Sequence, residues 1–354
     1  MNTMPKQEMT HKERILAALN HQPTNRIPLD YWGVPETTEK LMRHFGVSSY
    51  PELIKALDID AIIGVDPKLV ADRKNIWDIE MRKVPIGNNA YYDEPMSAPL
   101  ADYETIDEIE ANYVFPTADM FDYSGIREQC KANEGFAIIG GYISLTYFYE
   151  IIRGTEQMLI DFVAFPEIAE YIFEKLHEYA HENTKRILDA GDGKIHLSQV
   201  TDDFGTQNSL IASPEMLDKY LGKYYEENIK LVKSYDVKVF HHNDGAMTPM
   251  LPWLVNKGID VLNPLQWHLP GWDLQQIKKD YGKKLCFHGG IDNQDVLPFG
   301  SEQDVKNEVE ACMNALYADK TGYILAPCHN IQANTPIENV ITMYNHARQY
   351  SKCM

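Results

Sequence analysis

Short apolar runs alternate along the chain with longer stretches whose apolar residues recur every three or four positions. The short runs predict β-strands and the longer stretches predict helices, because the two periods fit these two backbones. Eight runs qualify as strands: 26–33, 60–67, 136–144, 194–205, 237–245, 260–266, 284–293 and 323–332. The clearest helices cover 166–190, 214–235, 301–316 and 337–350.

Regular alternation of strands and helices favours parallel strands joined by right-handed crossovers. Eight such strands predict an α/β fold, a single (β/α)8 TIM barrel spanning 1–354, with a helical extension at the N-terminus. A doubly wound open sheet is the alternative. The first strand, however, is not followed by the glycine-rich loop that binds nucleotides in many such sheets.

One stretch, 72–134, interrupts the alternation between the second and third strands. It is rich in tyrosine, proline and acidic residues. We expect an insertion with a β-hairpin over 81–92, followed by a loop and a helix. Long insertions often serve as lids or binding loops, and a solvated decoration of the surface is the alternative.

The charge of the chain narrows the set of partners. It has 33 Lys and Arg against 52 Asp and Glu, a formal net charge of −19. Such a surface repels nucleic acid and anionic membranes, so neither is expected as a partner. The 5 cysteines are an odd number without CxxC spacing, and no apolar run of membrane-spanning length or signal peptide is evident. These features predict a reducing, cytoplasmic location.

Reactive side chains collect where the predicted strands end, which is where barrel enzymes place their active sites. His242 and Asp244 are the strongest signal, because a turn at Gly245 lets both face one centre. A histidine and a carboxylate suit Zn²⁺ or another divalent metal, with Cys328 or His329 as a further ligand. The alternative is that His242 and Asp244 hydrogen-bond each other or a substrate without a metal.

Asp202 and Asp203 are the second signal. Neighbouring carboxylates at a strand end repel each other, and burial raises a carboxyl pKa, so one of them is a candidate general acid. A helix cap and a loop carboxylate are the alternative. Further strand-end residues are candidate substrate contacts: Tyr31, Tyr147, Gln207, Asn263, Gln266, His288 and Asp292.

Several segments together resemble one known group of proteins. THKERILAALNHQPTNRIPLDYWG, HHNDGAMTPMLPWLVNKGIDVLNPLQ, LCFHGGIDNQDVLPFG and YILAPCHNIQANTPIENVITMY are similar to segments of the uroporphyrinogen decarboxylase superfamily. This resemblance runs from about residue 10 to the C-terminus and implies a TIM barrel. Members of the superfamily often pair, which implies a possible homodimer.

The superfamily contains decarboxylases and corrinoid-dependent methyltransferases. Decarboxylases bind porphyrinogen carboxylates with N-terminal arginines, whereas this chain has RIPLDY at 26–31 and no matching arginine cluster. The methyltransferases that act on coenzyme M carry zinc on an HxC motif and a later cysteine. Here His242 matches the histidine, Asp244 replaces the first cysteine, and His329 falls on the second unless the register slips to Cys328. The ligand set of the thiol-activating zinc site in those methyltransferases is therefore not present in the same form in this chain.

VTDDFGTQ, HNDG, NPLQ, HGGID and PCHNIQ most resemble the substrate-side methyltransferases of anaerobic O-demethylase systems. This resemblance implies transfer of a methyl group from a methoxylated aromatic to a Co(I) corrinoid carried by a partner protein. His242, Asp244 and His329 would then activate the ether oxygen, and Asp202 or Asp203 would supply a proton or orient a ring hydroxyl. A cofactor-free decarboxylase with another substrate and a non-catalytic small-molecule-binding barrel are the alternatives.

Overall fold

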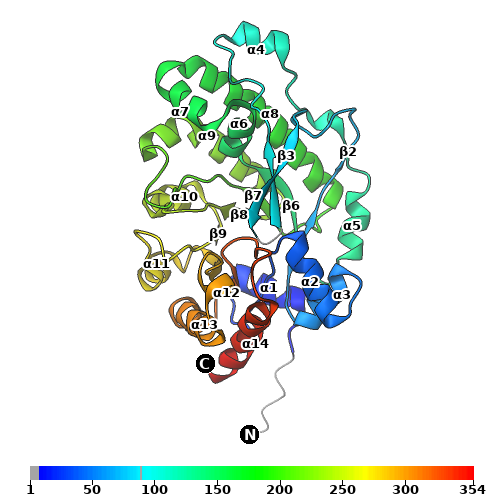
Figure 1. Cartoon of the computed structure of the whole chain (residues 1–354), viewed down its shortest axis with the longest axis vertical. Helices are drawn as coiled ribbons and strands as arrows, with labels where there is room; N and C mark the ends of the chain where they lie inside the picture. The colour runs from blue at the N-terminus through cyan, green and yellow to red at the C-terminus, as the bar shows by residue number, and fades with distance from the viewer. Residues whose placement is uncertain (1–7, 88–89) are drawn as a thin grey trace.

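The computed structural model describes residues 8–87 and 90–354. Its centre is a curved sheet of seven strands, in which each strand runs parallel to its neighbour (Figure 1). In order around the curve, the strands are β1 (Ile62–Val65), β6 (Ala137–Ile143), β7 (Leu197–Val200), β8 (Lys238–His242), β9 (Val261–Asn263), β10 (Cys286–Ile291) and β11 (Tyr323–Pro327). They correspond to the second to eighth strands expected from the sequence.

The segment expected as the first strand closes the sheet into a barrel. Leu29 and Gly33 form isolated parallel bridges to Leu325 and Ile331, beside β11. On its other side, the carbonyl of Leu29 accepts a hydrogen bond of 2.9 Å from the amide of Asp60, just before β1. The segment therefore lies between the first and last strands of the sheet, and the (β/α)8 barrel is confirmed.

The prediction that 26–33 forms a regular strand was nevertheless wrong. Pro28 has no backbone N–H to donate to a ladder. The amide of Ile62 donates to the side chain of Asp30, at 2.9 Å, instead of to a backbone carbonyl. The ladder to β1 is interrupted where this carboxylate replaces a backbone acceptor, and the bridges that the segment does form are isolated ones on the side of β11.

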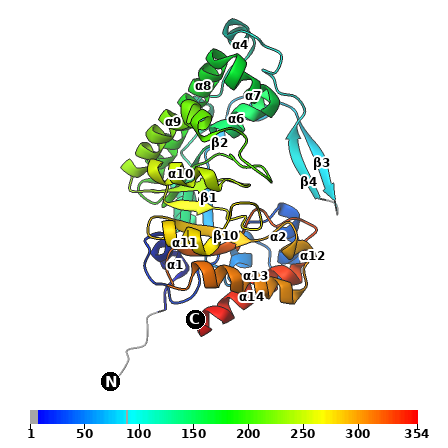
Figure 2. The same ribbon diagram turned by 90° about the vertical axis from the view of Figure 1, so that its left-hand side faces the viewer.

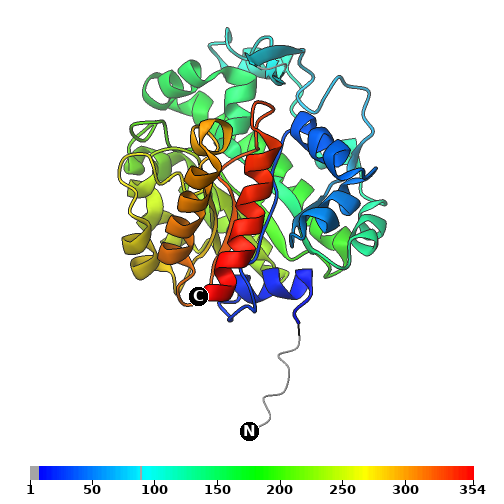
Figure 3. The same cartoon turned by 60° about the horizontal axis from the view of Figure 1, so that its bottom comes forward.

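Helices cover the outside of the barrel. Those that follow the insertion are α6 (Leu145–Arg153), α7 (Thr155–Ala164), α8 (Pro166–Gly191), α9 (Pro214–Ser234), α10 (Leu251–Lys257), α11 (Leu274–Tyr281), α12 (Val296–Phe299), α13 (Glu302–Leu316) and α14 (Ile337–Cys353). All four helices singled out in the sequence are present. Figure 3 shows α13 and α14 side by side on the outer surface. Among the described residues, no helix is both long and apolar enough to cross a membrane.

Capping explains where two of these helices begin. The hydroxyl of Ser213 accepts from the amide of Met216, and Pro214 occupies the first turn of α9. Ser301 and Asp304 form a reciprocal capping box at the start of α13. Both devices satisfy amides that the first turn of a helix leaves without partners.

Three helices precede the sheet: α1 (His11–Leu19), α2 (Pro35–Phe45) and α3 (Tyr50–Leu57). Ile15, Ala18 and Leu19 of α1 join a buried cluster with inward-facing strand residues, including Ala137 and Ile324. Helix α1 therefore closes the end of the barrel where the strands begin. The opposite end, where the strands finish, is called the mouth below.

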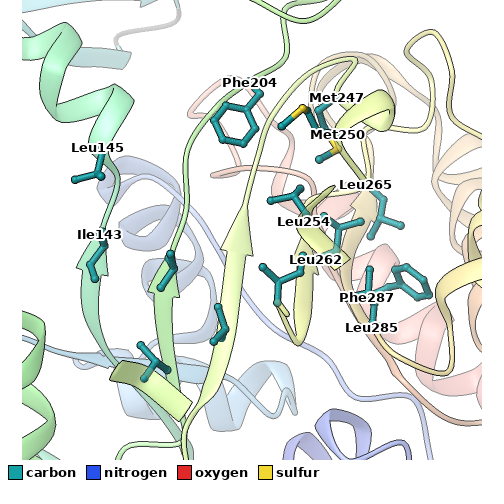
Figure 4. Packing of buried hydrophobic residues seen from close by; sticks show 14 of the residues in the cluster. Ile143, Leu145, Phe204, Met247, Met250, Leu254, Leu262, Leu265, Leu285 and Phe287 are labelled. Carbon is teal, nitrogen blue, oxygen red and sulfur yellow. The ribbon is translucent and has the colours of Figure 1, made fainter. Parts of the chain in front are cut away.

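The larger core lies between the sheet and the surrounding helices. Figure 4 shows a part of it, where Leu254 of α10 and Leu262 of β9 gather with Leu265. These side chains are fully buried. This packing holds the strands rigidly, so that residues at the strand ends keep fixed positions.

The insertion contains the expected hairpin. Its elements are β3 (Met81–Gly87), β4 (Ala90–Pro95), α4 (Ile106–Asn112), β5 (Phe121–Asp122) and α5 (Ile126–Ala132), and β2 (Lys68–Leu69) comes just before it. Strands β3 and β4 pair antiparallel, and β2 pairs with β5. The insertion has two helices where one was expected. Figure 2 shows the hairpin standing away from the helices, on the side of α2 and α12. Short 3₁₀ turns occur at η1 (Ala118–Met120) and η2 (Thr248–Met250).

Candidate metal and substrate site at the barrel mouth

Three side chains meet at the mouth: His242, Asp244 and His329. Their ligand atoms all lie within 4.8 Å of one another. Asp244 Oδ2 is 3.7 Å from Nε2 of His242 and 3.9 Å from Nε2 of His329. We call this group the mouth triad. It is the only such group of metal-binding side chains found in residues 8–87 and 90–354.

A sharp turn places Asp244 in the triad. His242 ends β8, and the chain reverses at Gly245, whose φ of +89° favours glycine. A side chain there would also collide with Gly205, since a Cβ would lie 2.5 Å from its carbonyl carbon. Gln266 fixes the turn by accepting a hydrogen bond from the amide of Gly245. Gln266 was expected to line the pocket, but its side-chain oxygen serves the backbone instead.

A chain of buried hydrogen bonds supports His242 from behind. His242 Nδ1 lies 2.5 Å from Oδ1 of Asn263, whose Nδ2 lies 2.7 Å from Nδ1 of His288. His288 Nε2 then lies 2.9 Å from Oδ2 of Asp30. We call Asn263, His288 and Asp30 the buried relay. His288 and Asn263 were expected to touch substrate, but both are fully buried and engaged with each other.

The buried relay sets which nitrogen of His242 faces the triad. A carboxylate at Asp30 accepts the proton of His288 Nε2, so His288 Nδ1 accepts from the amide of Asn263. The oxygen of Asn263 then accepts from His242 Nδ1, which leaves Nε2 as the nitrogen of His242 that faces Asp244. Hydrogen bonding of the far nitrogen is the usual support for a metal-binding histidine.

The pKa values of the three side chains in the mouth triad are shifted by burial and by one another. Burial lowers the pKa of His242, but Asp244, Asp203 and Asn263 outweigh it and raise the pKa to about 9. Burial raises the pKa of Asp244, but His242 and His329 more than reverse this and lower it. Burial lowers the pKa of His329, which favours the neutral form that binds metals.

The triad fits a divalent cation. Asp244 Oδ1 is buried and accepts no hydrogen bond from any described residue. An orphaned buried carboxylate oxygen is costly unless a cation or donor satisfies it. Two imidazoles and one carboxylate match the ligands of Zn²⁺ or Fe²⁺ sites that keep positions open for substrate.

Cys328, the alternative ligand, lies outside the triad. Its thiol is buried and donates to the carbonyl of Leu265 at 3.4 Å. Burial raises the pKa of this thiol well above its usual range, which opposes the thiolate form that metals require. Of the two adjacent residues after β11, His329 is the one that faces the mouth.

Asp202 and Asp203 take different places. Asp203 is half exposed, accepts from the amide of Asp244 at 2.8 Å, and has Oδ1 3.9 Å from Nε2 of His242. Asp202 is buried, and its carboxylate accepts from the amide and hydroxyl of Thr146, both at 2.6 Å, and from Tyr225 at 3.0 Å. Only Asp203 therefore borders the mouth triad.

Burial raises the pKa of Asp202 to about 7, although the hydrogen bonds from Thr146 and Tyr225 oppose the shift. Burial also raises the pKa of Asp203, with His242 opposing and Asp244 adding to the shift. Asp203 thus combines a raised pKa with a position next to the triad. Between the two carboxyls, geometry favours Asp203 as the group that exchanges a proton with a ligand.

Two other expected contacts, Asp292 and Gln207, are not members of the triad. Asp292 accepts from the amides of Gln294, Asp295 and Val296, so it shapes the turn before α12. Gln207 is exposed on the loop after β7. Neither residue is among those that line the cavity described next.

Tyr147 is exposed at the rim of the mouth. Burial of its hydroxyl raises the pKa of Tyr147, and the nearby carboxylates of Glu150 and Asp203 raise it further. Tyr31 is buried, and its hydroxyl bonds to Thr38 at 2.9 Å. It lines a cavity inside the barrel, and its contact with a substrate stays a prediction.

This barrel cavity has a volume of about 320 Å³. Its lining residues are Asp30, Tyr31, Trp32, Gly33, Tyr50, Ile62, Gly64, Ile139, Gln199, Phe240 and Asn330. The ring of Trp32 connects the cavity to the triad, because its centroid lies 5.8 Å from that of His242. Sequence reasoning missed Tyr50 and Asn330 as site residues. Asn330 follows His329 directly, whereas Tyr50 belongs to α3 and no sequence signal marked it.

Comparison with known proteins identifies the family. The family model described as "Uroporphyrinogen decarboxylase (URO-D)" matches residues 85–350. The chain therefore belongs to the uroporphyrinogen decarboxylase family, as the sequence segments indicated.

Among curated relatives, a uroporphyrinogen decarboxylase from Prochlorococcus marinus (strain AS9601) is 24% identical over 139 residues, 39% of this chain and 38% of that protein. One from Microcystis aeruginosa is 24% identical over 207 residues, 57% of this chain and 52% of that protein. The matched region thus spans well under two thirds of these relatives. A solved structure described as "methyltransferase from Methanosarcina mazei" shares the fold with a TM-score of 0.66, at 17% identity, over 97% of this chain and 99% of that one.

Proposed function

We propose that the protein is a methyltransferase that moves a methyl group from a methoxylated aromatic to a Co(I) corrinoid carried by a partner protein. The observation that carries this proposal is the mouth triad, open to solvent and adjoining a cavity with aromatic walls. Family membership and a fold shared along nearly the whole chain with a methyltransferase structure support it.

In this reaction the bond between the methyl carbon and the ether oxygen breaks. The oxygen keeps the electron pair of that bond and takes up a proton. The methyl group goes to the corrinoid of the partner protein, whose Co(I) supplies the electron pair of the new bond and is formally oxidised to Co(III). An aryl ether resists this step because a phenolate is a poor leaving group, so the oxygen needs activation. A divalent cation at the mouth triad would supply Lewis acidity to that oxygen.

The residues of this chain then have separate tasks. His242, Asp244 and His329 would hold the cation, and the buried relay keeps His242 in the orientation that presents Nε2. Asp203 lies beside the triad with a raised pKa and delivers the proton to the departing oxygen. The barrel cavity holds the ring, which fixes the methoxyl group near the mouth and excludes water.

The cavity argues against decarboxylation of a porphyrinogen. A porphyrinogen carries several carboxylates, and a binding site for it needs cations to pair with them. None of the residues that line the barrel cavity is a lysine or an arginine.

The direct test mixes the purified protein with a reduced corrinoid protein and a panel of methoxybenzenes. Methyl transfer changes the visible absorbance of the Co(I) corrinoid, and we expect this change with one or more panel members. The variant His242→Ala should abolish it. His346→Ala is the matched control, since His346 lies on the outer helix α14, where its ring bonds to Glu310 and belongs neither to the triad nor to the cavity lining.

Two results contradict the proposal. One is no absorbance change with any panel member when the corrinoid protein is active with another methyl donor. The other is a folded His242→Ala protein that transfers methyl groups at the full rate.

A further inference from the structure

The walls of the barrel cavity fit a flat apolar ring. The rings of Trp32 and Phe240 lie side by side in the cavity wall, tilted by 34° with centroids 6.1 Å apart, and Ile62 and Ile139 add aliphatic surface. A volume of about 320 Å³ is at the lower end of the range for small-molecule pockets. The cavity therefore accommodates one substituted benzene ring and excludes much larger ligands.

Three neutral polar side chains reach this cavity without partners. Tyr50, Gln199 and Asn330 make no side-chain hydrogen bond to any residue in the part of the chain that the structure describes. All three are only partly exposed. Polar groups that converge on a cavity and remain free are the ones that orient a ligand, so a hydroxyl-bearing ring would find donors and acceptors here.

The only charged side chain in the lining is negative. Both oxygens of Asp30 are already occupied, Oδ1 by the amide of Ile62 and Oδ2 by Trp32 and His288. No lysine or arginine of the described residues lines the cavity. A carboxylate bound here would lose its hydration, meet no cation and lie near a second negative charge.

We propose that the barrel cavity selects uncharged, hydroxylated methoxybenzenes and rejects those that carry a carboxylate on the ring. The proposal rests on the function proposed above, whose substrate class it narrows. It assigns Tyr50, Gln199 and Asn330 to ring recognition, with Trp32 and Phe240 as the walls.

The test measures binding to the protein alone, by calorimetry or by quenching of tryptophan fluorescence. Three probes differ in one substituent: 2-methoxyphenol, vanillyl alcohol and vanillate. Vanillyl alcohol is the neutral counterpart of vanillate at nearly equal size. We expect the two neutral probes to bind, and vanillate to bind roughly tenfold or more weakly than vanillyl alcohol, since an unpaired charge is disfavoured. Vanillate binding as tightly as vanillyl alcohol, or no binding of either neutral probe, overturns the proposal.

A charge introduced into the cavity gives a second, independent test. Gln199→Lys should shift the preference from vanillyl alcohol toward vanillate by roughly tenfold or more, because the new ammonium pairs with the carboxylate. Gln199→Met is the matched control, with a similar length and no charge: loss of the amide should weaken the binding of both probes, without a shift of the preference toward vanillate. A folded Gln199→Lys protein that binds both probes with an unchanged ratio contradicts the placement of the ring in this cavity.

The binding and transfer experiments separate the two proposals. If the neutral probes bind preferentially but no corrinoid is methylated, the proposed function fails and the assignment of the cavity stands. If vanillate is bound and demethylated as well as vanillyl alcohol, the proposed function stands and the selectivity fails.

Discussion

The two ends of the barrel handle buried charge in opposite ways. At the closed end, Asp60 is fully buried and accepts from Arg14, Arg26, His11 and the amide of Leu29. At the mouth, one oxygen of Asp244 is buried without any donor among the described residues. A satisfied charge holds the structure together, whereas an unsatisfied one implies a ligand. The closed end is therefore built for stability and the mouth for chemistry.

The largest effect on activity is expected when the carboxylate at the mouth is neutralised. Asp244→Asn should lower methyl transfer by about a thousandfold or more, because losing a metal ligand removes several kcal/mol of charge stabilisation. The unfolding free energy of the metal-free protein should change much less than when a fully satisfied buried charge is removed, since Oδ1 has no partner among the described residues and Oδ2 lies 3.7 and 3.9 Å from its two imidazole neighbours. Activity assays and denaturant unfolding measure the two effects. Asp280→Asn, on the exposed face of α11, is the control.

The same substitution also tests the metal. A chelator should remove a tightly bound cation from the wild type and abolish transfer, and added Zn²⁺ or Fe²⁺ should restore it. Asp244→Asn protein should retain little metal in elemental analysis. A wild-type protein that is metal-free and fully active would show that the triad works by hydrogen bonding alone.

At the closed end, the opposite pattern is expected. Asp60→Ala leaves the guanidinium of Arg14 buried without its charge partner, and should lower the unfolding free energy by about 3–5 kcal/mol. Activity per folded molecule should remain near that of the wild type, because Asp60 lies at the far end of the barrel. Chemical denaturation combined with activity at low temperature checks both parts. A large loss of activity in folded Asp60→Ala protein would mean that the two ends are coupled.

A smaller effect is expected from the buried relay. His288→Gln breaks the hydrogen bonds to Asn263 and Asp30 and so loosens the orientation of His242. Metal affinity should fall by about 10- to 100-fold. His241→Gln is the matched control: His241 is equally buried on β8, but it bonds to Val200 and Asn243, outside the buried relay. Equal losses of metal affinity in the two variants would reduce the role of His288 to packing.

The parts of this architecture differ in how far the sequence predicts them. Periodicity alone located seven of the strands, because each is a short apolar run between polar turns. His242 and Asp244 were found together because they are two positions apart and precede a glycine. The buried relay was out of reach, since Asp30 and His288 are 258 positions apart and meet only when the barrel closes.

Asp202 and Asp203 show the same limit at short range. The sequence does not distinguish the two adjacent carboxylates, so both were predicted as candidate general acids. Adjacent residues of an extended chain point to opposite sides, but the sequence pattern does not tell which of the two side chains faces the mouth. The contacts to Thr146 and Tyr225 decide it by burying Asp202. Tyr225 belongs to helix α9, which lies further along the chain than the two carboxylates and meets Asp202 only in the folded structure. The environments of the two carboxylates therefore depend on tertiary packing.

The smallest expected effect is a pH dependence of stability that arises from Asp202. Its pKa is about 7 in the folded protein, against 3.8 for the unfolded chain. The folded state therefore binds more protons between these two values, and stability falls as the pH rises through that window. Between about pH 5 and about pH 8, the wild type should lose on the order of 2 kcal/mol more unfolding free energy than Asp202→Asn, whose amide does not titrate.

Denaturant unfolding of both proteins across this pH range measures the difference. Other titrating groups, including His242, are common to the two proteins and cancel in the comparison. Parallel pH curves would show that Asp202 stays ionised throughout, stabilised by Thr146 and Tyr225 more than burial disfavours it. In that case Asp202 would resemble Asp60, as a satisfied structural charge, although it lies at the mouth.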